Sequence, residues 1–267
     1  MPYTRRGSSW LRGAALGALL VAAAPAASAA PAAAEAAPES AAAWIARMNQ
    51  ALRPGHSMQA ELRMDTRDRA GEGIELRLRE ARVTDAAGVR FSVRVEAPPA
   101  GKGTVMTVLD RPGQPLVRTL YDPLLRRVRE LVGVRRTDAF MGTEFSYEDM
   151  DTVAPPERAG GTAERIRMGG RELVRLTSPP FGPYERIVSD LDPTTALPLQ
   201  VQFYDRAGQL YKVERFGEVK TIQGHPVPTR IEMSDAETGG RTTIALEHVR
   251  FDEPVPDAAF DLGVPGR

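Results

Sequence analysis

The sequence predicts a mainly β fold in a single domain, in which antiparallel strands form one sheet that curls around an interior. Apolar and polar residues alternate from Leu199 to Phe251, and this period of two is typical of strands with one buried face. Turn-forming segments such as Asp205–Gly208 and Glu237–Gly240 separate these strands, which indicates consecutive hairpins. The chain contains no repeat of fixed period, so a propeller or a solenoid is not expected.

Residues 1–29 are predicted to be a cleaved signal peptide. Arginines precede the apolar run Ala14–Ala24, and the small residues Ala27–Ala29 resemble a cleavage site. The run is roughly half of the ~20 residues that a transmembrane helix needs, and Pro25 interrupts it, so a permanent anchor is the weaker alternative. No cysteine follows the cleavage site, so we expect an exported mature chain without a lipid on its N-terminus.

A flexible leader and one helix are predicted next. Residues 30–39 are rich in alanine and proline, which is typical of an unstructured leader, and the folded domain is expected to span residues 40–267. Ser40 is a suitable N-cap for a helix that ends near Leu52, and its apolar residues recur at helical spacing. We expect this amphipathic helix to act as a lid, with Trp44, Ile45 and Met48 as its lid residues.

The front half of the domain is predicted to contribute five strands. Period-two alternation runs over Met58–Met64, Ile74–Leu78 and Phe91–Val95, and shorter strands are expected at Thr104–Leu109 and Leu116–Tyr121. The apolar face of these strands either fills a core or lines a ligand cavity, and the flexible thioethers of its methionines favour the cavity. The candidate cavity residues are Met58, Leu62, Met64, Ile74, Leu76, Leu78, Phe91, Val93, Val95 and Met106.

The segment from Thr137 to Met150 breaks the strand pattern. Its apolar residues are irregularly spaced among polar ones, which predicts short helical turns in which the Ser146 side chain binds backbone amides. The acidic residues between positions 144 and 151 do not have the spacing of a calcium loop. We expect the segment to form the second part of the lid, through Phe140, Met141, Phe145, Tyr147 and Met150.

The back half of the domain returns to strands. Alternation predicts strands over 164–168, 171–177 and 184–191, before the hairpins that begin at Leu197. In total about eleven strands are expected. Gly217, and the change of parity between Leu246 and Val249, indicate bulges, which help a sheet to coil.

Composition excludes several classes of protein. The chain has no cysteine, which rules out disulfides, catalytic thiols and thiolate metal sites. Loss of residues 1–29 takes away three of the 35 basic residues and none of the 35 acidic ones, which leaves a net charge of −3. This charge does not suggest binding to a nucleic acid or to an anionic membrane.

No catalytic, metal or cofactor site is predicted. The histidines His56, His225 and His248 are scattered, and none lies at ligand spacing from another, so neither a metal site nor a catalytic base is expected from them. Ser146 lacks the glycines of a nucleophile elbow, and Gly101–Thr104 lacks the first glycine of a phosphate-binding loop. We therefore expect a protein that is not an enzyme, with a hydrolase as the weakest hypothesis.

A cluster of arginines flanks Leu131 and Val132. It either contacts lipid headgroups or an acidic transporter surface, or it is the solvated face of a strand, and the pattern leaves these alternatives open. The cluster comprises Arg126, Arg127, Arg129, Arg135 and Arg136.

Three segments together resemble one known family. Phe140–Met150, Leu210–Met233 and Thr242–Phe260 are similar to the outer-membrane lipoprotein-sorting protein family, a branch of the LolA/LolB-like periplasmic lipoprotein carriers. Val95–Thr104 and Leu120–Val128 extend the likeness more loosely. The resemblance implies a single unclosed, half-open antiparallel β-barrel, with short helices as a lid over its mouth and an apolar cavity that accepts acyl chains. It favours a cavity over a filled core.

The function that the resemblance implies is a non-enzymatic carrier. Such a protein holds a lipid or a lipoprotein in the periplasm and helps to deliver it toward the outer membrane, and we expect it to be a monomer. Gly142–Glu144 departs from the lipoprotein carriers, so the cargo can be another lipid. In those carriers an arginine of an early strand holds the lid, but residues 82–90 align too poorly to choose one here. The alternative function is an accessory protein that docks on an exporter of the resistance-nodulation-division (RND) type.

Overall fold

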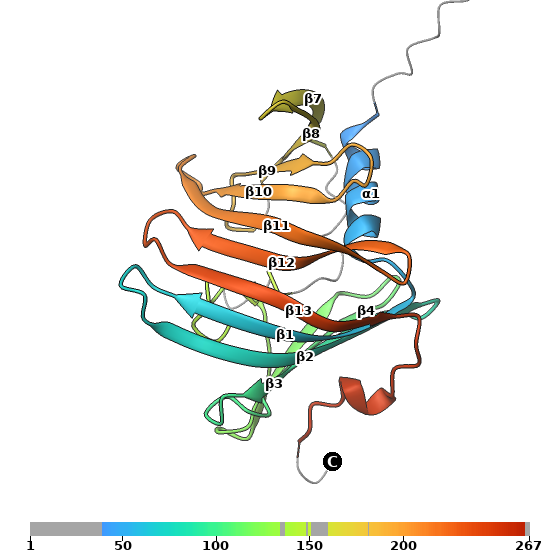
Figure 1. The fold of residues 1–267 in the computed structure, drawn as a ribbon. Helices are drawn as coiled ribbons and strands as arrows, with labels where there is room; N and C mark the ends of the chain where they lie inside the picture. The colour runs from blue at the N-terminus through green and yellow to red at the C-terminus, as the bar shows by residue number, and fades with distance from the viewer. Residues whose placement is uncertain (1–38, 134–136, 148, 151–159, 181, 265–267) are drawn as a thin grey trace, which may run out of the picture. The chain divides into compact units, whose positions relative to one another are not determined.

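The computed structural model describes residues 39–133, 137–147, 149–150, 160–180 and 182–264. The strands in this part of the chain belong to a sheet of thirteen, in the order β6-β5-β4-β3-β2-β1-β13-β12-β11-β10-β9-β8-β7 (Figure 1). The strands are β1 (Ser57–Arg67), β2 (Gly73–Asp85), β3 (Gly88–Ala97), β4 (Val105–Asp110), β5 (Val117–Asp122), β6 (Arg127–Glu130), β7 (Thr162–Met168), β8 (Arg171–Ser178), β9 (Arg186–Leu191), β10 (Pro198–Tyr204), β11 (Leu210–Ile222), β12 (His225–Asp235) and β13 (Arg241–Phe251).

The chain enters this sheet at its centre. From β1 it runs outward through successive hairpins to β6 at one edge, and it continues from β7 at the opposite edge. It then returns inward until β13 pairs antiparallel with β1. Among the described strands, β6 and β7 are the two edges and do not pair with each other, so the sheet is unclosed. The predicted mainly β, unclosed antiparallel barrel is confirmed.

The strands differ in number and length from the prediction. The structure has thirteen strands where alternation predicts about eleven. The alternation does not indicate β6, because this strand has four residues and is largely exposed. β2 continues to Asp85, beyond the apolar alternation that ends at Leu78. Because residues two apart share a face of a strand, the extension places Glu80 and Arg82 on the inward face with Leu76 and Leu78.

One of the two predicted bulges is found. The pairing of β1 with β13 shifts register between Gln59 and Glu61, and His248 has a φ of 51° there, which confirms the predicted bulge between Leu246 and Val249. The prediction of a bulge at Gly217 is wrong, because β11 and β12 keep the same register on both sides of it, although Glu218 has a positive φ of 49°. The bulge in β13 increases the local twist of its strand, which helps the sheet to curl.

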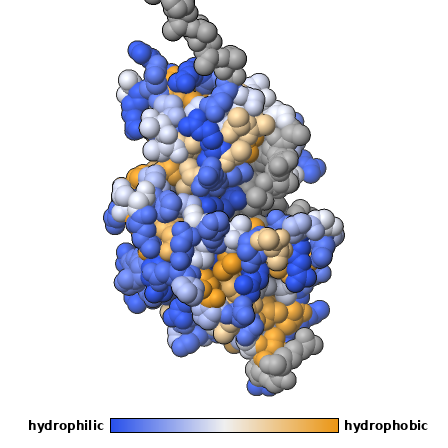
Figure 2. Space-filling view, turned by 90° about the vertical axis from the view of Figure 1, so that its right-hand side faces the viewer, coloured by the Kyte–Doolittle hydropathy of each residue, from blue (hydrophilic) through white to orange (hydrophobic). Residues whose placement is uncertain are grey.

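The predicted lid helix is α1 (Ala41–Leu52). The Ser40 side chain accepts a hydrogen bond of 3.2 Å from the backbone N–H of Ala43, so its predicted role as N-cap is confirmed. Trp44 and Ile45 are buried in a small apolar cluster with Val174 and Leu176, which fixes the first half of α1 beside β8 (Figure 1). The face on the α1 side of the sheet is largely hydrophilic, with separate hydrophobic patches (Figure 2).

The second part of the lid is a loop rather than a helix, which corrects the expectation of short lid helices there. Ala139 and Ser146 form an isolated β-bridge, and Met141 has a φ of 52°, which a helix does not allow. The predicted cap is confirmed, since the N–H of Asp149 donates to Ser146 Oγ (3.1 Å) and the N–H of Ser146 donates to Asp149 Oδ2 (2.8 Å). We call the described residues 138–147 and 149–150 the crossing loop.

The first residues of the chain lie outside the described part. The predicted signal peptide, 1–29, and the leader, apart from Glu39, are therefore not tested, and the boundary at residue 40 stays a prediction. In the described part, no helix is long and apolar enough to cross a membrane.

Candidate ligand cavity

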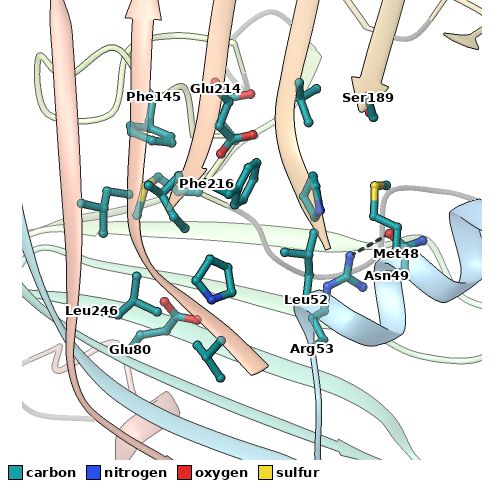
Figure 3. Close-up of a pocket in the computed structure, with 18 of the residues that line it drawn as sticks. Met48, Asn49, Leu52, Arg53, Glu80, Phe145, Ser189, Glu214, Phe216 and Leu246 are labelled. Atoms are coloured by element: carbon teal, nitrogen blue, oxygen red, sulfur yellow. Dashed lines mark hydrogen bonds between the residues drawn. The ribbon is translucent and has the colours of Figure 1, made fainter. Parts of the chain in front are cut away.

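A cavity of about 270 Å³ lies between the inward face of the sheet and the C-terminal half of α1 (Figure 3). Its size is near the lower end of the range for small-molecule pockets, ~300–1,000 Å³. The apolar part of its wall comes mainly from β9 to β13, and the rings of Tyr184 and Phe203 pack there with centroids 4.8 Å apart and planes tilted by 46°. Other apolar lining residues are Met48, Leu52, Met58, Leu62, Phe145, Met150, Ile187, Val201, Phe216, Val227, Ile231, Ile244, Leu246 and Phe251.

The crossing loop covers the inward face beside this cavity. Its Glu144 N–H donates a hydrogen bond of 2.9 Å to Thr242 Oγ1 on β13, and Lys212 Nζ on β11 donates one of 2.8 Å to the Glu144 carbonyl oxygen. Two residues before Glu144, Gly142 lies beside Ile74 of β2. The loop thus joins strands that are far apart in the sheet order, and its Phe145 and Met150 reach the cavity wall.

The carboxyl groups of Glu80 on β2 and Glu214 on β11 point into the cavity (Figure 3). Glu80 is 4% exposed, and its Oε1 has no hydrogen-bond partner among the described residues. Burial raises the pKa of Glu80 to about 7, against a smaller opposite effect of the Arg82 charge. Burial also raises the pKa of Glu214 to about 8, and the negative charge of Asp149 adds to this while Lys212 opposes it.

Arg82 connects the sheet with the end of α1. Its buried guanidinium donates hydrogen bonds to the Pro54 carbonyl oxygen (2.8 Å) and to Thr84 Oγ1 (3.1 Å). Burial lowers the pKa of this guanidinium, and the negative charge of Glu80 partly counters that effect. Since Pro54 follows α1 directly, this contact holds the C-terminal end of the helix against β2.

The predicted cavity residues fall into three groups. Met58 and Leu62 line the cavity, whereas Ile74 is 40% exposed at the surface. The others are buried in the main core cluster beside the cavity rather than on its wall. These core residues are Met64, Leu76, Leu78, Phe91, Val93, Val95 and Met106.

The predicted lid residues are also divided. Met48, Phe145 and Met150 line the cavity. Trp44 and Ile45 instead anchor α1 in its own cluster. Phe140 and Tyr147 pack in the main core with their rings edge to face, 5.4 Å between centroids, and Met141 packs against that core.

The sequence interpretation missed the ionisable groups of the cavity. Glu80 and Arg82 continue the inward row of β2, and Glu214 occupies an inward position of β11 opposite Met233. The period of two was therefore a sufficient signal for Glu80, which follows Leu76 and Leu78 on an apolar face, but not for Glu214, whose row on β11 also contains Lys212. In the described part of the chain, no group of three or more histidine or acidic side chains is arranged to hold a metal ion.

Comparison with known proteins assigns the chain to a family. A family model described only as "uncharacterized protein" matches residues 88–263. The chain belongs to this family. No curated protein matches the sequence of this family member.

Solved structures show the same fold. A DUF1329 family protein from Desulfovibrio piger has a TM-score of 0.74 at 21% identity, over 83% of this chain and 95% of its own. A putative outer membrane lipoprotein-sorting protein domain from Vibrio parahaemolyticus has a TM-score of 0.71 at 23% identity, over 82% and 96%. The LolA superfamily protein NE2245 from Nitrosomonas europaea has a TM-score of 0.67 at 15% identity, over 84% and 98%. The LolA-like fold that the sequence resemblance implied is confirmed.

Proposed function

We propose that this protein is a periplasmic carrier that holds the acyl chains of a lipid or a lipoprotein in its cavity and helps to deliver them toward the outer membrane. The observation that carries this proposal is an apolar cavity between α1 and the inward face of a LolA-like sheet. The printed name of the similar Vibrio parahaemolyticus domain, a putative lipoprotein-sorting protein, supports it. The predicted signal peptide supports the periplasmic location.

Burial of hydrocarbon supplies the affinity in this proposal. Each buried CH₂ group contributes ~0.8 kcal/mol, so about a dozen of them contribute on the order of 10 kcal/mol before the cost of ordering the chain. The side chains of Tyr184, Phe203 and Phe216 provide apolar area on the cavity wall. Binding of an acyl chain to this area requires no polar contact. Because the cavity is small, a long chain either extends through its mouth or requires α1 to move outward.

We propose that Arg82 holds α1, the lid helix, in its closed position. Its hydrogen bond to the Pro54 carbonyl fixes the end of α1, while Met48 and Leu52 of the same helix line the cavity. Loss of this contact frees the helix end to move. The cargo then leaves for an acceptor that binds it more tightly, since a carrier at equilibrium has no direction of its own.

The test is native mass spectrometry with lipid extraction on mature protein purified from its native envelope without detergent. The proposal predicts a bound acylated species at a fixed stoichiometry. Leu246→Glu places a charge on the cavity wall and is expected to abolish this species. Ala245→Glu is the matched control, because Ala245 is the adjacent residue on the opposite face of β13, where it pairs with Arg63 and Arg230. A folded Leu246→Glu protein that retains its lipid contradicts the proposal.

An exposed hairpin favours a second candidate function, an accessory protein that docks on an RND-type exporter. Leu124 and Leu125 are 76% and 69% exposed in the β5–β6 turn. Their backbone N–H groups both bind Asp122 Oδ1, at 2.9 and 3.1 Å, so the turn holds them outward next to Arg126 and Arg127. Apolar tips beside basic residues suit an acidic protein surface with an apolar centre.

This second function has a separate test. The double variant Leu124→Ser, Leu125→Ser is expected to lose co-purification with the exporter while it keeps its bound lipid. Co-purification that is unchanged in the double variant removes the hairpin as the docking surface.

A further inference from the structure

The buried carboxyl of Glu80 is not satisfied by hydrogen bonds from the described residues around it. It lies on the inward face of β2, opposite Ala60 of β1 and Val93 of β3, and its nearest inward neighbour along β2 toward the N-terminus is Leu78. Among the described residues, Oε1 has no hydrogen-bond partner although the side chain is nine-tenths buried. A buried acceptor without a donor is unfavourable, and such groups are rare in folded proteins.

The cation beside Glu80 does not satisfy it. The guanidinium of Arg82 uses two of its nitrogens for Pro54 and Thr84, and no ion pair joins Glu80 to a basic side chain in the part of the chain described. Glu80 lines the cavity, so its buried carboxyl lies next to the space that a bound molecule would occupy (Figure 3). A purely hydrocarbon ligand has no hydrogen-bond donor for this carboxyl.

We propose that the cavity takes an amphiphile whose polar head carries an O–H or N–H donor, and that this head enters the cavity and donates a hydrogen bond to Glu80. The inference rests on the proposed lipid-binding function and defines the chemical class of its ligand. A hydroxyl or an ammonium group fits, whereas a carboxylate or a phosphate lacks the donor and is repelled by an ionised Glu80.

Other charged groups line the cavity besides Glu80. Glu214, separated from Glu80 by β1, β13 and β12 in the sheet order, adds another carboxyl to the wall. Arg53 is near Asn49 on α1 (3.5 Å), and Asp149 binds the Ser146 N–H and lies 3.6 Å from Lys212 Nζ. The charged side chains that line the cavity are Arg53, Glu80, Arg82, Arg118, Asp149 and Glu214.

The pH dependence of binding distinguishes an ammonium head from a hydroxyl head. The pKa of Glu80, raised by burial to about 7, means that its charge changes near neutral pH. An ammonium head gains a charge partner as Glu80 ionises, so its binding strengthens as the pH rises from 6 to 8. A hydroxyl head donates a hydrogen bond to either form, and its binding changes much less over the same range.

The experiment uses delipidated mature protein and three probes of equal chain length, dodecanol, dodecylamine and dodecanoate, each below its micelle concentration. Their binding is measured by displacement of the neutral fluorophore N-phenyl-1-naphthylamine. We expect at least one of the two donor heads to bind about tenfold more tightly than dodecanoate, the size of one charge-assisted hydrogen bond. The pH profile shows which donor the site prefers.

Variants assign this preference to Glu80. Glu80→Leu is expected to remove about tenfold of the preference while all three chains still bind. Glu80→Gln keeps an acceptor without the charge, so it retains the preference for dodecanol and loses the pH dependence for dodecylamine. Glu214→Gln is the matched control and is expected to keep most of the preference. Circular dichroism verifies that each variant is folded.

The results distinguish the role of Glu80 in binding the polar head from the proposed function as an acyl-chain carrier. Equal binding of the three probes to the wild type, or a preference that survives Glu80→Leu, overturns the inference and leaves the acyl-chain carrier intact. Failure of all three probes to bind, in a folded protein that holds no lipid from its envelope, overturns both.

Discussion

The two wings of the sheet use the same alternation but enclose different interiors. In β2 to β4 the inward side chains of Leu76, Phe91, Val93 and Met106 are almost completely buried. In β11 to β13 the inward side chains of Phe216, Ile231 and Leu246 keep partial exposure because they face the cavity. The crossing loop and its aromatic residues pack into one core with the first wing, whereas α1 leaves space over the second. A period of two therefore identifies which face is inward, but what covers that face decides whether it becomes core or cavity wall.

The largest expected difference between the wings is the cost of removing an aromatic ring. Phe91→Ala, in the first wing, is expected to lower the free energy of unfolding by about 3–5 kcal/mol, because it leaves a cavity in a close-packed core. Phe216→Ala, on the cavity wall, is expected to cost less than half as much, since space already exists there. Urea denaturation of both variants measures this, and equal costs contradict the distinction between the wings.

The buried carboxyl of the cavity predicts an unusual dependence of stability on pH. The pKa of Glu80 rises from its ordinary value of 4.5 to about 7 on folding, so the folded state binds more protons than the unfolded state in this interval. Stability is therefore fully present below about pH 4.5 and is lost as the pH rises through 7, by on the order of 3 kcal/mol.

Urea denaturation at pH 5 and pH 8 tests this effect. Glu80→Gln is expected to remove the part of the pH dependence that comes from Glu80, whereas Glu75→Gln, at an exposed position on the same strand, leaves the dependence unchanged. A pH dependence in Glu80→Gln equal to that of the wild type shows that Glu80 ionises normally.

The contact between α1 and the sheet predicts a smaller, local effect. Arg82→Met removes the hydrogen bond to the Pro54 carbonyl and is expected to destabilise the C-terminal end of α1 by about 1–3 kcal/mol. Hydrogen exchange of the amides of Met48 to Leu52 reports this loss directly. Arg79→Met, on the outward face, is the control, and equal exchange in both variants argues against Arg82 as the lid contact.

The smallest predicted effect concerns the crossing loop. Ser146→Ala removes the acceptor for the Asp149 N–H and is expected to cost about 1 kcal/mol. Because Phe145 and Met150 flank this cap and line the cavity, we also expect faster release of a bound fluorophore. Unchanged stability together with unchanged release indicates that the core contacts of Phe140 and Phe145 hold the loop without the cap.

Local patterns in the sequence predicted much of the fold. Alternation identifies most of the strands, Ser40 marks the start of α1, and the change of parity between Leu246 and Val249 marks a bulge, because each of these depends on near neighbours in the chain. The crossing loop could not be predicted in this way. Its path depends on contacts with Thr242 and Lys212, which lie about 70 to 100 positions further along the chain.

The site was predicted less completely than the fold. Of the ten candidate cavity residues, Met58 and Leu62 line the observed cavity. The other eight do not, because the place of the cavity depends on how α1 lies against strands that are distant in the chain. Glu80 was accessible to the same reasoning, since it continues the inward row of Leu76 and Leu78, whereas the row of β11 that contains Glu214 also contains Lys212 and does not read as an apolar face. A charged residue on the apolar face of a predicted strand is therefore a candidate site residue, like the apolar residues around it.

The comparison of the two wings places the acyl chain of the ligand against the second wing and not the first. The most direct measurement loads the mature protein with a photoactivatable lipid whose diazirine lies near the end of its acyl chain, and maps the cross-links by mass spectrometry. We expect labels on Met48 of α1 and on Phe203, Phe216 and Leu246 of β10 to β13. Labels concentrated on Leu76, Phe91 and Val93 of β2 and β3 would contradict it.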